Sequence, residues 1–206
     1  MPETIVVGTK NKKKLAELEA MLGAAGFVFR SIDEVRPGLL APAETGETFE
    51  ANAALKALYF AEKSGLLCLA DDSGLEVSAL NGAPGVHSAR YAGEPSDDTR
   101  NNRKLMDELR GIPLERRGAD FVCVVAVARP GRLLLSTRGT CHGVILEEPR
   151  GAGGFGYDPY FYYGPLKRCF AELTAEEKHE ISHRGKALRE LERRASEISA
   201  RTNEKA

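Results

Sequence analysis

The stretch TIVVGTKNKKKLAEL, residues 4–18, indicates the fold class. Residues 4–9 are rich in β-branched side chains, which is typical of a buried strand. After the turn residue Asn11, leucines recur at helical spacing from Leu15 to Leu22. A buried strand, a polar turn and a helix in this order predict an α/β unit.

The same alternation continues toward the middle of the chain. Residues 27–32 are a predicted second strand, and an apolar stripe that starts at Phe49 predicts a helix with one face on the core. Residues 66–70 are a predicted third strand, which ends directly in Asp71-Asp72-Ser73-Gly74. We expect these acids to lie beyond the carboxyl end of that strand, where ligands collect in open α/β sheets.

The second half of the chain adds a hairpin and a terminal helix. Two long apolar runs, residues 120–129 and 133–145, predict strands around the turn Pro130-Gly131. The last helix is expected to begin at Thr174 with a capping box and to continue to about Ile198. These elements predict an α/β fold with a mixed central sheet. No break in composition separates domains, so residues 1–206 are expected to be one domain with a frayed tail over about 199–206.

The composition excludes several classes of protein. The 206 residues include 29 Lys+Arg and 30 Asp+Glu, a formal net charge of −1, so no overall charge attracts nucleic acid or a membrane surface. No run of ~18 apolar residues is present to cross a bilayer. The N-terminus places a short apolar run before its charges, the reverse of a signal peptide. Four scattered cysteines without a CxxC pair fit a reducing compartment, so we expect a cytoplasmic protein.

A basic turn follows the first predicted strand. Free backbone N–H groups at the start of the next helix, together with the helix dipole, favour an anion there, and lysines add positive charge. The segment lacks GxxxxGK[ST] and is therefore not a Walker A loop. A solvated basic turn is the alternative. The residues of this turn are Thr9, Lys10, Asn11, Lys12, Lys13 and Lys14.

The adjacent acids Asp71 and Asp72 are candidate metal ligands. Two buried carboxylates repel one another unless a cation or hydrogen-bond donors neutralise them. Mg²⁺ binds through one or two carboxylates together with substrate phosphates, and so it suits this pair. Glu44 or Glu47 could supply a second carboxylate. A turn with an Asp cap is the alternative.

A glycine-rich aromatic segment, GGFGYDP, covers residues 153–159. Glycines let a planar ligand approach the main chain, and an aromatic ring can stack on a nucleobase. The alternative is an aromatic loop that packs on the core.

The sequence HEISH, residues 179–183, matches the HExxH pattern of zinc peptidases. This spacing is expected to place His179 and His183 on one face of a helix, with Glu180 beside them. A catalytic zinc site also needs a third protein ligand, and the few residues after His183 place their acids along a charged helix. In the other interpretation, His183 and Arg184 are donors at the rim of a nucleotide site.

Taken together, several segments resemble one family, that of the inosine/xanthosine triphosphate pyrophosphatases. The similarity runs in the right order from about residue 5 to 190. The matching segments are TKNKKK at 9–14, TGETF with NA at 45–53, ADDSG at 70–74, GVHSARYAG at 85–93, GFGYDP at 154–159 and AELTAEEKHEISHR at 171–184.

This resemblance implies an elongated mixed sheet, two lobes with a cleft between them, a homodimer and dependence on Mg²⁺. It also implies hydrolysis of ITP, dITP and XTP, non-standard purine nucleoside triphosphates, to the monophosphate and pyrophosphate, which clears them from the nucleotide pool. Residues 9–14 would hold the triphosphate. Asp72 would be metal ligand and base for the attacking water, and Ser73 would contact the nucleotide. The residues around base and sugar would be Phe155, Gly156, Tyr157, Asp158, Lys178, His183 and Arg184.

The sequence departs from the family pattern at three places. Ala43 stands where the family often has a second acid before Glu44, so a second metal carboxylate is open. Ala51 replaces a frequent acid, and His87 stands where Tyr is common. Two other functions are weighed beside hydrolysis, a zinc peptidase and a non-catalytic nucleotide-binding module. Zinc bound at His179 and His183 in a metal analysis would favour the peptidase over a pyrophosphatase. An activity assay would distinguish a pyrophosphatase from the non-catalytic module.

Overall fold

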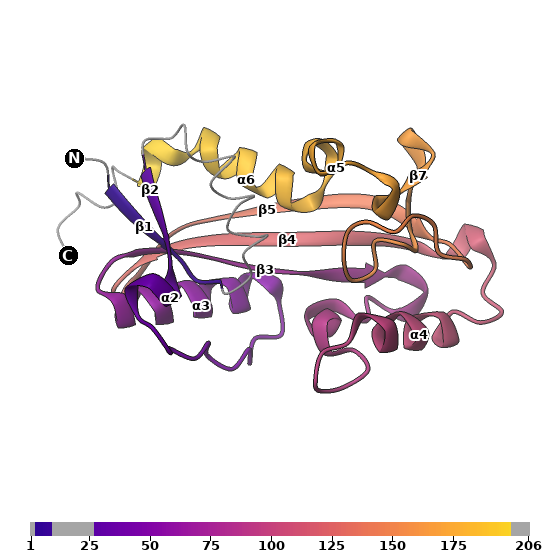
Figure 1. The fold of residues 1–206 in the computed structure, drawn as a ribbon, viewed down its shortest axis with the longest axis horizontal. Coiled ribbons are helices and arrows are strands. Elements are labelled where there is room, and N and C mark those ends of the chain that lie inside the picture. Colours follow the sequence, from indigo (N-terminus) through magenta and orange to yellow (C-terminus); the bar gives the residue numbers. More distant parts are fainter. Residues whose placement is uncertain (1–2, 10–26, 199–206) are drawn as a thin grey trace. The chain divides into compact units, whose positions relative to one another are not determined.

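The computed structural model describes residues 3–9 and 27–198, which form a seven-stranded sheet in the order β2-β1-β3-β4-β5-β6-β7 (Figure 1). β1 (Glu3–Val7) pairs in parallel with β2 (Phe27–Ser31) and with β3 (Leu67–Val77). The last pairings, β5 with β6 and β6 with β7, are antiparallel. The α/β fold with a mixed sheet is therefore confirmed.

The remaining elements follow in chain order. The strands are β4 (Gly118–Arg129), β5 (Arg132–Ile145), β6 (Phe161–Tyr163) and β7 (Arg168–Cys169). The helices are α2 (Ile32–Val35), α3 (Phe49–Ser64), α4 (Asp98–Glu108), α5 (Ala175–Ile181) and α6 (His183–Arg193). No described helix is long and apolar enough to cross a membrane.

The chain divides into two compact units. The first contains the described residues of Met1–Asp72, Cys123–Gly139 and Lys186–Ala206, and the second contains Ser73–Val122 and Thr140–Gly185. β3 therefore leaves the first unit directly after Asp72. The expected single domain with two lobes stays a prediction, as does the tail at 199–206, which lies outside the described residues.

In the first unit, α3 and α6 lie on opposite sides of the strands (Figure 1). The side chain of Thr48 caps α3 by accepting from the N–H of Ala51, and Gly65 ends the helix at φ +72°. The ring of Phe60 lies so close to β1 that a Cβ on Gly8 would come within 2.4 Å of it. This contact requires glycine directly after β1 and sets α3 against the strand.

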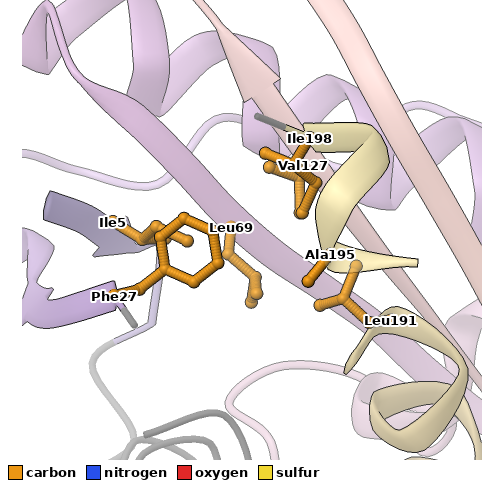
Figure 2. A pocket seen from close by; sticks show the side chains of 7 residues that line it. All are labelled: Ile5, Phe27, Leu69, Val127, Leu191, Ala195 and Ile198. Carbon is orange, nitrogen blue, oxygen red and sulfur yellow. The ribbon is translucent and has the colours of Figure 1, made fainter. Parts of the chain in front are cut away.

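On the α6 side, apolar residues of the strands meet Ala187, Leu188 and Leu191 in one buried cluster. A cavity of about 10 Å³ remains within it (Figure 2). That volume is at the lower limit for one water molecule, and the lining offers no hydrogen-bond partner. We therefore interpret it as a packing gap and not as a ligand site. Its lining residues are Ile5, Phe27, Leu69, Val127, Leu191, Ala195 and Ile198.

The second unit has its own core, in which Leu105 of α4 and Leu109, directly after that helix, pack with Leu75 and Val77 of β3. Phe121, Phe161 and Phe170 form its aromatic centre, with ring centroids 4.5–5.6 Å apart.

The expected end of β3 at Ala70 is wrong. The strand continues to Val77, so the segment Asp71-Asp72-Ser73-Gly74 lies inside it and not in a turn beyond it. Asp, Ser and Gly favour turns locally, but Leu75 and Val77 are fully buried on the far side of the segment. Burial of these two side chains keeps the backbone extended.

The expected single helix from Thr174 to Ile198 is also wrong. The capping box of Thr174 and Glu177 is present, but α5 ends at Ile181, and Ser182 has extended backbone (φ −69°, ψ 159°). The Ser182 hydroxyl then accepts from the N–H of Gly185 and caps a new helix, α6. His179 and His183 therefore belong to different helices, and the shared face that HExxH zinc binding needs does not form.

The first-unit core predicts a clear contrast between two leucines. Leu69→Ala removes a side chain that is 0% exposed and should lower the free energy of unfolding by roughly 2–5 kcal/mol. Leu40→Ala changes a side chain that is 74% exposed and should alter it by less than about 0.5 kcal/mol. Urea denaturation followed by circular dichroism measures both. Equal effects would contradict the packing described for β3.

Candidate functional site

A buried lysine joins two carboxylates in the first unit. The Nζ of Lys56, on α3, donates to Glu44 Oε1 and to Asp72 Oδ1, at 2.7 Å in both cases. The side chains of Lys56 and Asp72 are 11% and 8% exposed, and that of Glu44 is 26% exposed. Glu47 is exposed. Of the two loop acids weighed as second carboxylates, Glu44 is thus the one that reaches this cluster, hereafter the Lys56 cluster (Glu44, Lys56 and Asp72).

The loop that carries Glu44 is held against α3 by Asn52. The Oδ1 of Asn52 accepts from the backbone N–H of Gly46 at 2.8 Å. The approach is so close that a Cβ on Gly46 would come within 2.7 Å of that oxygen and 2.8 Å of the Ala51 Cβ. Asn52 and Lys56 are one helical turn apart and share a face of α3. The loop is therefore fastened one turn away from the lysine that its glutamate contacts.

Burial controls the charges of this cluster. The pKa of Asp72 is raised by desolvation, which outweighs the lowering effect of Lys56, while Glu44 and Asp71 raise it further. Desolvation alone would lower the pKa of Lys56, but the surrounding carboxylates, Asp72 first, raise it on balance. Lys56 thus remains a cation at neutral pH, and Asp72 becomes a stronger base than an exposed aspartate.

One oxygen of Asp72 is available for a ligand. Oδ1 accepts from Lys56, whereas the buried Oδ2 has no hydrogen-bond partner among residues 3–9 and 27–198. Leaving a carboxylate oxygen without a partner is costly. Within the same residues, no group of three or more His, Cys, Asp or Glu side chains is placed to hold a metal. This donor set fits a hard cation that takes one or two carboxylates and completes its coordination with phosphate or water.

The second unit places an aromatic ring beside two cations. Phe155 is 42% exposed, and Lys178 Nζ lies 4.5 Å from its ring centroid. The guanidinium carbon of Arg184 is 6.0 Å from the same centroid. An exposed ring with positive charge beside it suits a planar, electron-rich ligand.

Asp158 organises the loop under this ring. Its Oδ2 accepts from the backbone N–H of Phe155 at 2.9 Å and forms a salt bridge with Lys178. Gly154 has φ +74°, and a Cβ there would come within 2.2 Å of the carboxylate, so glycine is required. Desolvation raises the pKa of Asp158, although Lys178 opposes the shift.

Three other candidate residues also lie in the second unit. His183 is 5% exposed and stacks on Phe121, with the ring centroids 4.8 Å apart. Arg184 Nη2 donates to Ser73 Oγ at 3.2 Å. Tyr157 is buried, and its hydroxyl donates to the carbonyl of Ser88, which indicates a packing role.

The structure therefore brings the candidates together in two groups. Asp72 belongs to the Lys56 cluster, and Ser73, Asp158, Lys178 and Arg184 lie with the aromatic loop. Gly8 comes directly after β1, and its N–H donates to the carbonyl of Leu69. Thr9 is the next residue. The rest of the basic turn, Lys10, Asn11, Lys12, Lys13 and Lys14, lies outside the described residues.

Sequence reasoning missed Lys56. A signal was present, because Lys56 falls on the same helical face as Phe49, Ala53 and Phe60, all of which are buried. A lysine on an apolar helical stripe indicates a buried partner of opposite charge. The partner acids are distant in sequence, so the stripe alone does not identify them.

Comparisons with known proteins identify the family of the chain. A model of the Ham1 family matches residues 5–194, and the chain belongs to that family. It is 54% identical over 185 residues to the dITP/XTP pyrophosphatase of Desulforamulus reducens, covering 90% of this chain and 92% of the relative. It is 50% identical over 194 residues to the dITP/XTP pyrophosphatase of Geobacillus kaustophilus, with coverage of 94% and 95%.

Solved structures show the same fold. A HAM1 protein from Coxiella burnetii superposes with a TM-score of 0.88 at 41% identity, over 95% of this chain and 99% of that chain. A nucleoside-triphosphatase / dITP/XTP pyrophosphatase from Mycobacterium abscessus superposes with a TM-score of 0.77 at 46% identity, over 91% and 98%.

The Lys56 cluster predicts how the charge of Asp72 responds to its neighbour. Lys56→Met removes the cation that lowers the pKa of Asp72, so that pKa should rise further above its ordinary value. Carbon-13 NMR titration of the aspartate carboxyl groups measures the change. The matched control is Lys63→Met, an exposed lysine in the last turn of the same helix, which should leave Asp72 unchanged. An unshifted Asp72 in Lys56→Met would contradict the ion pair.

Proposed function

We propose that this protein hydrolyses the triphosphates of inosine, deoxyinosine and xanthosine to the nucleoside monophosphate and pyrophosphate. The observation that carries the proposal is the buried Lys56 cluster, in which Asp72 keeps one oxygen without a partner among the described residues. Membership of the Ham1 family and relatives named dITP/XTP pyrophosphatase support it.

In this proposal Asp72 is the general base. Its raised pKa makes it a better proton acceptor than an exposed aspartate, and the oxygen that Lys56 does not contact can receive the proton of a water molecule. Lys56 fixes the carboxylate through Oδ1 and prevents it from turning away. The water then attacks the α-phosphorus, its oxygen forms the new P–O bond, and the bond to the bridging oxygen breaks as pyrophosphate leaves.

The proposal includes Mg²⁺, which Asp72 and Glu44 would hold together with the substrate phosphates. When bound, Mg²⁺ offsets the negative charge of the polyphosphate. The protein supplies the hard oxygen ligands, from strand β3 for Asp72 and from the loop before α3 for Glu44. The lysines of residues 9–14 add positive charge for the triphosphate.

The nucleobase is assigned to the aromatic loop. Phe155 offers a half-exposed ring for stacking, and Lys178 and Arg184 lie beside that ring with donor groups. His183, which precedes Arg184 in sequence, is assigned to the same base. Inosine and xanthosine carry a 6-oxo acceptor where adenine carries an amino donor. Arg184 has only donors and His183 can donate, so both suit that oxygen.

The remaining parts of the proposal are a homodimer, as the resemblance implies, and a cytoplasmic location. The four cysteines are free and buried, which suits a reducing compartment.

The first test is the identity of the products. With Mg²⁺ present, ITP, dITP and XTP should release pyrophosphate, because attack at the α-phosphorus leaves the β–γ anhydride intact. A panel of nucleoside triphosphates scored for pyrophosphate against orthophosphate measures this. Asp72→Asn, which should keep the fold and lose most turnover, is the control for the assigned base. Stepwise release of orthophosphate would rule out the proposed attack.

The second test is base selection. Arg184→Ala should raise KM for ITP roughly tenfold more than for ATP, because the arginine donors match the 6-oxo group and oppose the adenine amino group. Phe155→Ala removes stacking that any purine can use, so it should weaken both substrates about equally. Steady-state kinetics on the two nucleotides measure the ratio. A proportional loss on ITP and ATP in Arg184→Ala would make Arg184 a structural or phosphate-binding residue.

A further inference from the structure

Helix α4 contacts the aromatic loop (residues 153–159) through the backbone N–H and the backbone carbonyl of one residue, Gly156. The backbone N–H of Gly156 donates to Asp98 Oδ2 at 2.7 Å, and Asn102 Nδ2 donates to the Gly156 carbonyl at 2.9 Å. Asp98 and Asn102 are four residues apart on α4 and therefore share a face. They lie 58 and 54 residues from Gly156 in sequence, so only the fold brings them together.

The held segment needs such support. Gly154 and Gly156 have φ of +74° and +61°, so the chain around Phe155 follows a path that glycine permits and no regular structure stabilises. The N–H of Gly156 belongs to the peptide bond that joins it to Phe155. Holding that N–H and the next carbonyl fixes the backbone directly after the exposed ring.

The side-chain amide of Asn102 is oriented so that it keeps its hydrogen bond to the Gly156 carbonyl. Its Nδ2 donates to the carbonyls of Asp98 and Gly156, while its buried Oδ1 has no hydrogen-bond partner in the part of the chain that the structure describes. Turning the amide would give up both donor contacts. The side chain is therefore used as a donor to Gly156 although its own acceptor is left unsatisfied.

The helix itself is anchored to a second loop. Asn101 Oδ1 accepts from the N–H of Ala92, and its Nδ2 donates to the carbonyl of Ala89. Leu105 and Leu109 place the same helix in the core of the second unit. The contacts to Gly156 thus start from an element that is fixed by packing and by hydrogen bonds.

We propose that Asp98 and Asn102 are positioning residues for nucleobase binding, acting through Gly156 to hold Phe155 in the orientation that stacks on a purine. This deepens the proposed function and rests on it for the identity of the ligand. The pair contacts no base and carries no chemistry. The pair restricts the loop before the nucleotide binds, so that less conformational entropy is lost on binding and the affinity is higher.

A tryptophan reporter tests the positioning without any substrate. The chain contains no tryptophan, so Phe155→Trp creates a single tryptophan, which can be excited selectively beside the six tyrosines, at the ring that the pair is proposed to hold. Adding Asp98→Ala or Asn102→Ala should lower its fluorescence anisotropy, because the loop gains freedom. Asp97→Ala is the matched control, since the neighbouring Asp97 bonds within α4, where it caps the helix by accepting from the N–H of Arg100. Unchanged anisotropy in both loop variants would overturn the proposal.

Kinetics on ITP then test the consequence. Asp98→Ala and Asn102→Ala should each raise KM about tenfold and leave kcat within about twofold, since each removes one hydrogen bond to the loop, and that bond acts on substrate binding before the chemical step. Asp98→Asn keeps an acceptor and should recover most of the loss. In a Phe155→Ala background, the Asp98 and Asn102 variants should have little further effect. An equal loss with and without Phe155 would overturn the proposal.

The two proposals fail in different ways. If the wild-type protein released no pyrophosphate from any purine triphosphate, the proposed function would be wrong, and the anisotropy of the reporter would still decide whether α4 holds the loop. If ITP were hydrolysed and the anisotropy did not change, only the positioning role would be wrong.

Discussion

The ion-pair cluster of Lys56 is the interaction on which the proposed chemistry depends. A buried carboxylate, Asp72, and a partly exposed one, Glu44, come together from separate segments of the chain because one ammonium group contacts both. Without that cation, desolvation and mutual repulsion would favour the protonated form of Asp72. The lysine occupies one oxygen of Asp72 and leaves the other for a ligand. Charge compensation and reactivity thus come from the same contact.

Contacts between helical side chains and loop glycines give both candidate loops their shape. Asn52 holds Gly46 against α3 in the first unit, and Asp98 with Asn102 holds Gly156 against α4 in the second. In each case a helical side chain bonds to the backbone of a glycine in a neighbouring loop. A loop fixed in this way can present a charged or aromatic side chain without regular secondary structure of its own. The helices therefore act as supports for residues that they do not themselves carry.

Several features of the molecule followed from sequence alone because their causes are local. The β-branched run of β1, the apolar stripe of α3 and the capping box at Thr174 each depend on neighbours a few residues away. The α/β class could be inferred from the order of these elements. Local reasoning failed where distant burial outweighed turn propensity, as in β3, which continues to Val77 through Asp-Asp-Ser-Gly. It failed again at Ser182, because the same residue types occur inside helices and as caps.

The series of short motifs by itself determined the family and the residue types of the candidate site. Asp72, Phe155, Asp158, Lys178 and Arg184 could all be named before any fold was known, because each stands in a recognisable local pattern. Only the tertiary structure decided their partners: that Lys56 joins Asp72 to Glu44, that Asp158 pairs with Lys178, and that α4 holds Gly156. The reason is physical. The secondary-structure propensity and the spacing of residues depend on their neighbours along the chain. The energy of a buried charge depends instead on which distant groups the fold places against it.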